Sequence, residues 1–269
     1  MRLLSEVLML LVAGCFMLSG CGTMANSRGW GQDATLAPGW ERLGRAALNA
    51  ARAPETWAPA AGALAFQIGH ADPNVASWAS KNTPVYGSQE NAESTSNRLL
   101  HAAGGLWVAS GLAAPSGDTF EEWAVNKVQG FAVEGGTGIV TRGVVGYLKN
   151  ATDRTRPNGV ARGSFPSAHA TGTALYCTQT SKNLDAFGWF DGTLTAARIS
   201  LGAITAATAW ARVEANQHYP SDVLGGIAIG HFLGAFLTDA FLGLDNPRQV
   251  MLLFEPSREG AVAMVRFGF

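Results

Sequence analysis

The chain has 269 residues and a formal net charge of −1, so it lacks the excess of positive charge that is typical of nucleic-acid-binding proteins. Hydrophobic residues make up 47% of the chain, which excludes a disordered, highly charged polypeptide and supplies a core of ordinary size. No repeat of fixed period is visible, and the length allows one or two domains.

Residues 1–20 have the pattern of a bacterial secretion signal. Arg2 gives a positive start, and Leu3 to Leu18 is mostly apolar but too short for a transmembrane span. The sequence Leu18-Ser-Gly-Cys21 resembles a lipobox, which implies cleavage before Cys21 and lipid on its thiol and amine. Gly22 resembles the residue found there in lipoproteins destined for the outer membrane. We therefore expect a lipid-anchored protein of the bacterial envelope, at the outer membrane and facing the periplasm.

Two alternatives to this lipoprotein signal stay open: an ordinary signal peptide, and a shorter lipobox that ends at Cys15. Residues 21–36 are rich in Gly, Ser, Asn and Thr, which predicts a flexible tether. Cys177 lies in an apolar run and is the remaining cysteine, so we expect a buried, inert thiol and no intramolecular disulfide.

Apolar residues recur at helical spacing through most of residues 37–246, which predicts one all-α bundle domain. Pro54 and Pro59 are expected to break the first helix, and Gly135-Gly136 to divide another. Asp118 to Glu121 is a variant of a capping box, and Asp191 is expected to cap a helix. The expected helices are 38–52, 121–134, 137–150, 191 to 212 or 214, and 220–242, with further apolar segments at 60–70 and 96–114.

The polar segment 72–97 is expected to be a long connection, placed as a loop over a site. Residues 247–269 form the C-terminal tail, in which Val250–Phe254 and Ala261–Phe267 predict a short β-hairpin. Val223 to Leu242 is the best candidate membrane span, but His231 and Asp239 interrupt it. We therefore expect a bundle in water, and a compact membrane domain built from small and charged residues stays open as the alternative. His231 is expected on the helix face opposite Asp222, in packing or in a helix–helix hydrogen bond.

Three short stretches carry the chemistry. Lys149 and Arg156 lie seven residues apart across a helix end, and Arg212 lies at the end of a separate helix. Three cations that converge would neutralise a phosphate and the charge that builds in its transition state. Arginine suits this role because its planar fork matches two phosphate oxygens.

The second stretch, Pro166-Ser-Ala-His169, precedes an apolar helical run. The start of a helix presents free N–H groups and a partial positive charge, which favours an anion. Ser167 adds a hydroxyl donor, and His169 in the first turn could reach a leaving-group oxygen. In the third stretch, Asp222 lies four residues after His218 at a helix start, where a carboxylate can fix the tautomer of an imidazole.

These stretches resemble the type 2 phosphatidic acid phosphatase (PAP2) superfamily, which includes bacterial acid phosphatases and vanadium haloperoxidases. Its pattern is a Lys, six residues and Arg-Pro; then Pro-Ser-Gly-His; then Ser-Arg, five residues, a His, three residues and an Asp. All three parts occur here in order and with this spacing, within roughly residues 146–226. Two positions depart from it, Ala168 in place of Gly and Ala211 in place of a frequent Ser. Neither change removes a catalytic group, though both could lower the rate.

The resemblance implies a helical bundle of the PAP2 and haloperoxidase type and a phosphatase that needs no metal and no cofactor. It implies that His218 is the nucleophile and forms a phosphohistidine, that Asp222 orients it, and that His169 protonates the leaving alcohol and then activates water. The phosphate ligands that it implies are Lys149, Arg156, Ser167, Arg212 and the N–H of Ala168.

The expected partner is a phosphorylated substrate, either a small molecule or a lipid such as phosphatidic acid or lipid A, together with a membrane through Cys21 and no nucleic acid. Two other functions stay open. A vanadate-dependent haloperoxidase has a nearly coincident site, and bound vanadate with halide oxidation would distinguish it. A non-enzymatic envelope lipoprotein with a degenerate site is disfavoured, because every acid, base and cation of the pattern is present.

Overall fold

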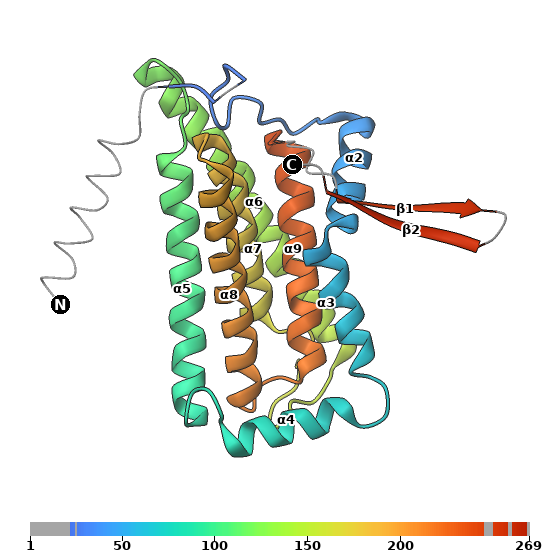
Figure 1. Cartoon of the computed structure of the whole chain (residues 1–269). Helices are drawn as coiled ribbons and strands as arrows, with labels where there is room; N and C mark the ends of the chain where they lie inside the picture. The colour runs from blue at the N-terminus through green and yellow to red at the C-terminus, as the bar shows by residue number, and fades with distance from the viewer. Residues whose placement is uncertain (1–21, 25, 245–249, 258–259, 268–269) are drawn as a thin grey trace, which may run out of the picture.

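Figure 1 shows the computed structural model, which describes residues 22–24, 26–244, 250–257 and 260–267. The expected signal peptide (1–20) and the expected lipidation site Cys21 lie outside the described residues. The elements in chain order are α2 (Gly39–Arg52), α3 (Pro54–Ala65), α4 (Ala71–Asn82), α5 (Gln89–Ala113), α6 (Phe120–Thr152), α7 (Ala168–Leu184), a 3₁₀ turn η1 (Asp185–Phe187), α8 (Asp191–Glu214), α9 (Pro220–Leu242), β1 (Val250–Ser257) and β2 (Gly260–Phe267).

Helices α5 to α9 run up and down along a common direction, and α4 crosses one end of them (Figure 1). Helix α9 packs against α7, α3, α2 and α6, so it lies at the centre of the bundle. The apolar sequence of α9 fits this position, because a helix that is hydrophobic all round needs partners on every side. The expected all-α bundle is confirmed.

The close approach of α7 and α9 depends on glycines spaced four residues apart on α9. A Cβ atom on Gly226 would lie 2.9 Å from the Ser167 carbonyl oxygen, and one on Gly230 would lie 2.2 Å from the Thr171 carbonyl oxygen. The backbones therefore meet where a side chain has no room, as small residues allow at helix crossings. Ser167 directly precedes α7, so this contact also sets the position of a predicted site residue.

We expect Gly230→Ala to destabilise the fold by about 1–3 kcal/mol, because its Cβ atom would overlap backbone that can move only with the whole of α7. The melting temperature should fall by several degrees. Gly143→Ala on α6 is the matched control, since a Cβ atom there meets nothing within 4 Å and alanine favours the helix. A Gly230→Ala protein that melts with the control would contradict the proposed close contact.

Four sequence expectations about helix ends are wrong. The 72–97 segment is not a long loop, because α4 fills Ala71–Asn82 and α5 begins at Gln89. Pro59 lies inside α3, whose first residue is Pro54. Gly135-Gly136 lies within α6, which runs unbroken for 33 residues. Phe190, not Asp191, occupies the N-cap of α8 and makes no side-chain cap.

Residues next to the helix ends explain where α6 begins and where α9 begins and ends. The capping box of α6 is shifted by one residue from the expected one: Thr119 Oγ1 accepts from the Glu122 N–H at 3.2 Å, and the Glu122 carboxylate accepts from the Thr119 N–H at 3.1 Å. Helix α9 begins with Pro220 and ends at Leu242, and the next residue, Gly243, has a φ of +81°, the left-handed conformation that closes a helix.

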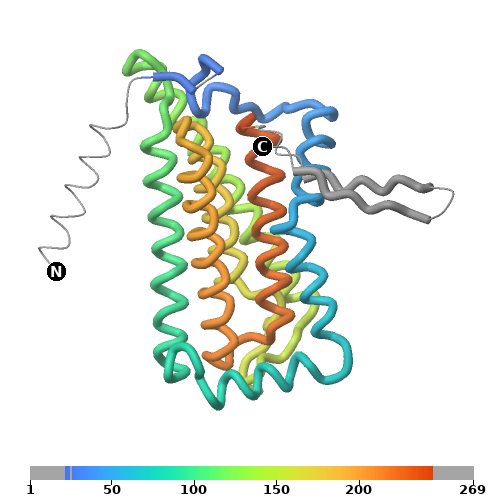
Figure 2. Tube along the Cα trace, in the orientation of Figure 1, coloured from blue at the N-terminus to red at the C-terminus, as the bar shows by residue number. Residues whose placement is uncertain are grey.

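The expected tether is wrong for the described part of residues 21–36, which runs across one end of the bundle (Figures 1 and 2). Trp30 is fully buried, and its Nε1 donates to Asn183 Oδ1 at 2.8 Å. Its ring lies where a Cβ atom on Gly130 would be, 2.2 Å from a ring carbon. The segment is rich in small polar residues, but the single large side chain of Trp30 anchors it to the bundle.

Three further expectations agree with the structure. His231 Nδ1 lies 2.7 Å from Thr56 Oγ1, so it joins α9 to α3, and Cys177 is a buried free thiol. Strands β1 and β2 pair antiparallel, with Val250 opposite Phe267. Among the described residues, α9 has the length and hydropathy of a membrane span, and 56% of its apolar window is buried in the bundle.

Candidate active site

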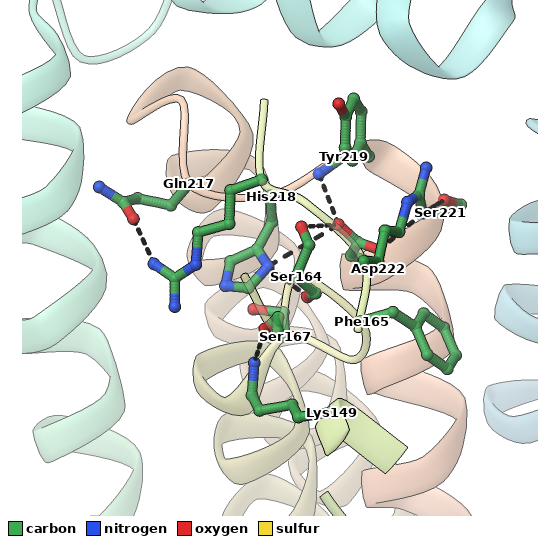
Figure 3. A network of polar contacts seen from close by, with 12 residues as sticks. Lys149, Ser164, Phe165, Ser167, Gln217, His218, Tyr219, Ser221 and Asp222 are labelled. Carbon is green, nitrogen blue, oxygen red and sulfur yellow. Dashed lines mark hydrogen bonds and ion pairs between the residues drawn. The ribbon is translucent and has the colours of Figure 1, made fainter. Parts of the chain in front are cut away.

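The three sequence stretches meet at the end of the bundle that α4 crosses (Figures 1 and 3). Lys149 lies in the last turn of α6, Ser167 precedes α7, Arg212 lies in the last turn of α8, and Asp222 lies in the first turn of α9. The backbone N–H of Ser167 donates to the Asp222 carbonyl at 3.1 Å, which ties the second stretch to the third.

The three predicted cations lie close enough for their charges to interact. Burial lowers the pKa of Lys149, and the charges of Arg156 and Arg212 lower it further, partly offset by Asp222. Lys149 Nζ donates to the Gly163 carbonyl, and Arg156 donates to Gln217 Oε1 at 2.5 Å. Arg212 is buried and donates to Ser96 Oγ at 3.1 Å. The fold thus concentrates positive charge around one point.

Several donors at this point are buried without an acceptor among the described residues: Ser167 Oγ, Arg156 Nε and Arg212 Nε. A serine that precedes a helix normally caps it, but Ser167 makes no side-chain cap, so its hydroxyl is free for another partner. Buried polar groups are rarely left unpaired in proteins. Because these groups are donors beside three cations, the partner that fits them is an anion with several oxygen atoms.

His218 is buried beside Asp222, and both belong to this cluster (Figure 3). Its Nδ1 lies 2.7 Å from the Ser164 carbonyl oxygen, which can only accept, so Nδ1 carries the proton and Nε2 has a free electron pair. Asp222 Oδ2 is farther from Nδ1, at 3.8 Å. Burial lowers the pKa of His218 to about 4, opposed by Asp222, so the ring is neutral at pH 7.

Asp222 acts on His218 mainly through Ser164. Its Oδ2 accepts from Ser164 Oγ at 2.5 Å and from the Tyr219 N–H at 2.9 Å, and its Oδ1 accepts from Arg154 at 2.7 Å. Burial alone would raise the pKa of Asp222, but the hydrogen bonds and the charge of Arg154 hold it below the usual range. Asp222 therefore stays ionised and fixes the loop whose carbonyl orients His218.

His169 lies in the first turn of α7, and its Nε2 is 2.7 Å from Asn97 Oδ1. The amide oxygen accepts, so Nε2 carries a proton and Nδ1 is the free nitrogen in the neutral ring. Burial lowers the pKa of His169 to about 4, and the charges of Arg212, His218 and Arg156 act in the same direction. A bound phosphate dianion would act in the opposite direction and favour the protonated ring.

Ala168 is the first residue of α7 and is exposed, so its N–H lies among the unpaired donors at a helix start. Ala211 is fully buried one residue before Arg212. Each departure from the sequence pattern thus lies next to a predicted phosphate ligand, Ala168 after Ser167 and Ala211 before Arg212.

Residues that the sequence did not single out complete the site: Asp72, Glu93, Ser96, Asn97, Arg154, Ser164 and Gln217. Arg154 joins two carboxylates, because it donates to Asp72 Oδ2 at 2.6 Å and to Asp222 Oδ1 at 2.7 Å. Its position two residues before Arg156 was a usable signal. No sequence signal pointed to Asp72 or to the α5 residues Glu93, Ser96 and Asn97, because 72–97 was expected to be a loop.

Comparisons with known proteins agree on the fold. Residues 133–243 match the model of the PAP2 superfamily. The structure is similar to the crystal structure of a transmembrane PAP2-type phosphatidylglycerolphosphate phosphatase from Bacillus subtilis, with a TM-score of 0.50 and 18% sequence identity. The similarity covers 69% of this chain and 93% of that one. No curated protein matches the sequence.

Proposed function

We propose, from the membership of residues 133–243 in the PAP2 superfamily, that this phosphatase hydrolyses a phosphomonoester or a diphosphate through a phosphohistidine on His218. The observation that carries the proposal is the set of buried donors without an acceptor, Ser167 Oγ, Arg156 Nε and Arg212 Nε, beside a neutral histidine whose Nε2 is free. Donors fixed before the substrate binds stabilise charge without reorganisation.

In the first step, His218 Nε2 attacks phosphorus, and the bond from phosphorus to the leaving oxygen breaks. Lys149, Arg156, Arg212 and the Ser167–Ala168 helix start hold the phosphoryl oxygens, while protonated His169 gives its proton to the leaving alcohol. In the second step, water attacks phosphorus, His169 accepts its proton, and the phosphorus–nitrogen bond breaks. Free phosphate leaves, and both histidines return to their first states.

Every group in these steps is a side chain or backbone N–H of this chain, so the proposed reaction uses no metal and no cofactor. We also propose that the protein is held at the envelope membrane by lipid on Cys21, at the outer membrane and facing the periplasm. The lipobox supports this placement. The substrate is either a soluble phosphate ester or a lipid phosphate.

The direct test is to trap the covalent intermediate. The protein is mixed with a ³²P-labelled phosphate ester in the presence of chelator and quenched at millisecond times. We expect label on the protein that is labile in acid and stable in base, as a phosphoramidate is, and competition by vanadate. Label on an ester-forming residue, or halide oxidation with bound vanadate in place of phosphate release, would overturn the proposal.

The histidine environments predict an acidic pH optimum for kcat/KM. His218 must be neutral, which requires a pH above its pKa of about 4, and His169 must be protonated, which requires a pH below its own pKa of about 4. The product of the two fractions is largest near pH 4 and falls about tenfold per unit at higher pH. The kcat profile should extend to higher pH, because bound phosphate raises the pKa of His169.

Asn97→Asp provides the control for this profile. A carboxylate in place of the amide that faces His169 Nε2 raises the pKa of His169, so the alkaline limb should move up by about one pH unit or more. The titration of the substrate itself is common to both proteins and cancels in the comparison. An unchanged alkaline limb in Asn97→Asp would show that His169 is not the acid.

A further inference from the structure

The described chain begins at the end of the bundle opposite the site. The Gly22 N–H donates to the Gly117 carbonyl at 2.9 Å, and the Gly117 N–H donates back to the Gly22 carbonyl at 3.0 Å. Gly117 lies in the connection between α5 and α6, at the bundle end away from α4 (Figure 1). Buried Trp30 holds the following residues in place. Cys21 is the residue before Gly22 in the sequence, so a lipid on Cys21 would be attached to the chain one residue before this fixed point.

The length of the central helix separates this point from the site. Asp222 lies in the first turn of α9, and Leu242 at the other end of α9 packs with Trp30 in one buried cluster. Helix α9 has 23 residues, which corresponds to about 35 Å at 1.5 Å per residue. A lipid on Cys21 therefore joins the bundle about one helix length from His218.

The end of the bundle that carries Gly22 also exposes large apolar side chains, which we call the distal face. Three elements start there: α2, α6 and α8 (Figure 1). Its members, with their exposed fractions, are Leu36 (91%), Trp40 (89%), Phe120 (80%), Trp189 (43%) and Phe190 (89%). Tryptophan and other aromatic side chains favour the interface between a bilayer and water.

The end of the bundle that holds the site also exposes apolar side chains, but it differs from the distal face in where the expected lipid is attached. Large apolar side chains are exposed at the site end as well: Leu64, Ile68, Trp78, Val85, Tyr147 and Val160. The chain that carries the expected lipid, however, does not join the bundle there. The distal face also holds Asp118, Glu121, Glu122 and Asp191, all exposed, so attraction to anionic lipid is not its binding force. A neutral bilayer surface that accepts aromatic side chains fits this composition.

We propose that the distal face rests on the bilayer that holds the lipid of Cys21, with the catalytic site directed away from that bilayer. The enzyme then takes phosphate esters from the aqueous side, either in solution or displayed on a facing membrane, and not from the leaflet that anchors it. This inference rests on the proposed phosphatase function and on lipidation of Cys21.

The geometry can be measured without activity. The full-length lipidated protein is placed on phosphatidylcholine vesicles that contain an acceptor-labelled lipid, and a donor dye is attached at one introduced cysteine. Asp191→Cys marks the distal face and Val160→Cys marks the site end; both positions are exposed, and Cys177 is buried. We expect strong energy transfer from position 191 and at least severalfold weaker transfer from position 160. Equal or reversed transfer, or failure to bind the vesicles, would overturn the proposal.

Activity provides the second measurement. The vesicle-bound protein is assayed on three substrates. They are a soluble aryl phosphate, phosphatidic acid in the vesicles that carry the protein, and phosphatidic acid in vesicles that carry no protein. We expect the soluble rate to match that of a non-lipidated Cys21→Ser protein within about twofold, with no gain for phosphatidic acid in the same vesicle. A tenfold preference for the same vesicle would refute the orientation. No hydrolysis of any substrate, with the dye result intact, would refute the function and leave the orientation standing.

Matched variants assign the contact to the distal face. In the Cys21→Ser background, Trp40→Ser with Phe190→Ser should reduce flotation with phosphatidylcholine vesicles by severalfold. Ile139→Ser with Ile199→Ser removes two residues that are 76% and 68% exposed on the side of the bundle, and it should leave flotation unchanged. A larger loss from the second pair would mean that the side of the bundle meets the bilayer, and would overturn the end-on arrangement.

Discussion

Replacing His218 with alanine should lower kcat/KM for an aryl phosphate by roughly 10³-fold or more, with chelator present throughout. The physical reason is that His218 Nε2 is the free nucleophile, while the surrounding cations can still bind phosphate. Phosphate should therefore bind the variant with nearly unchanged affinity, which isothermal titration calorimetry would measure. The ³²P label described above should disappear with the activity.

His70→Ala is the matched control for this result, because His70 is exposed before α4 and makes no side-chain cap. It should keep full activity. His218 is buried against the Ser164 carbonyl, so the melting temperature of His218→Ala must be compared as well. A folded His218→Ala protein that keeps its activity would remove the proposed nucleophile and the mechanism built on it.

The second large effect is expected from Arg154, which the sequence pattern did not identify. Arg154→Met leaves Asp72 and Asp222 without the cation between them, and their side chains are 4% and 0% exposed. Removal of one partner from a buried ion pair costs about 3–5 kcal/mol. We expect a melting temperature lower by several degrees, and a kcat lower by about tenfold or more because Ser164 and His218 lose their support.

The split between kcat and KM separates positioning from phosphate binding. Among the described residues, the Arg154 guanidinium contacts Asp72, Ser221, Asp222 and the ring of Tyr219, so KM should change little in Arg154→Met. Arg212→Lys is the contrast, since it removes a donor from the phosphate cluster and should raise KM as well as lower kcat.

A double variant tests the charge argument for Arg154. Adding Asp72→Asn to Arg154→Met removes one of the two unpaired carboxylates, so the double variant should be more stable than Arg154→Met alone. Arg154→Lys should recover part of the stability and part of kcat. If Arg154→Met retained wild-type stability and kcat, the bridge would be a surface contact without a role in positioning.

The sequence alone predicted the bundle and most of the candidate site residues that the fold gathers, because both depend on short-range patterns. Helical spacing of apolar residues predicted helices at 191–214 and 220–242, which match α8 and α9. The spacing of Lys149 to Arg156 and of His218 to Asp222 identified groups that the fold brings to one bundle end. Such motifs are readable because each lies within one helix end or one turn, where local geometry fixes the relative positions.

Tertiary structure alone decided the partners of these groups. Ser164, not Asp222, is the nearest acceptor for His218, and Asn97 faces His169 from a segment expected to be a loop. Asp72 reaches Arg154 across 82 positions of sequence, and no local pattern reports such a contact. Trp30 likewise becomes an anchor only because Gly130 on α6 leaves room for its ring. Sequence periodicity predicts which face of a helix is buried. Which atoms that face contacts depends on packing between segments that are distant in the sequence.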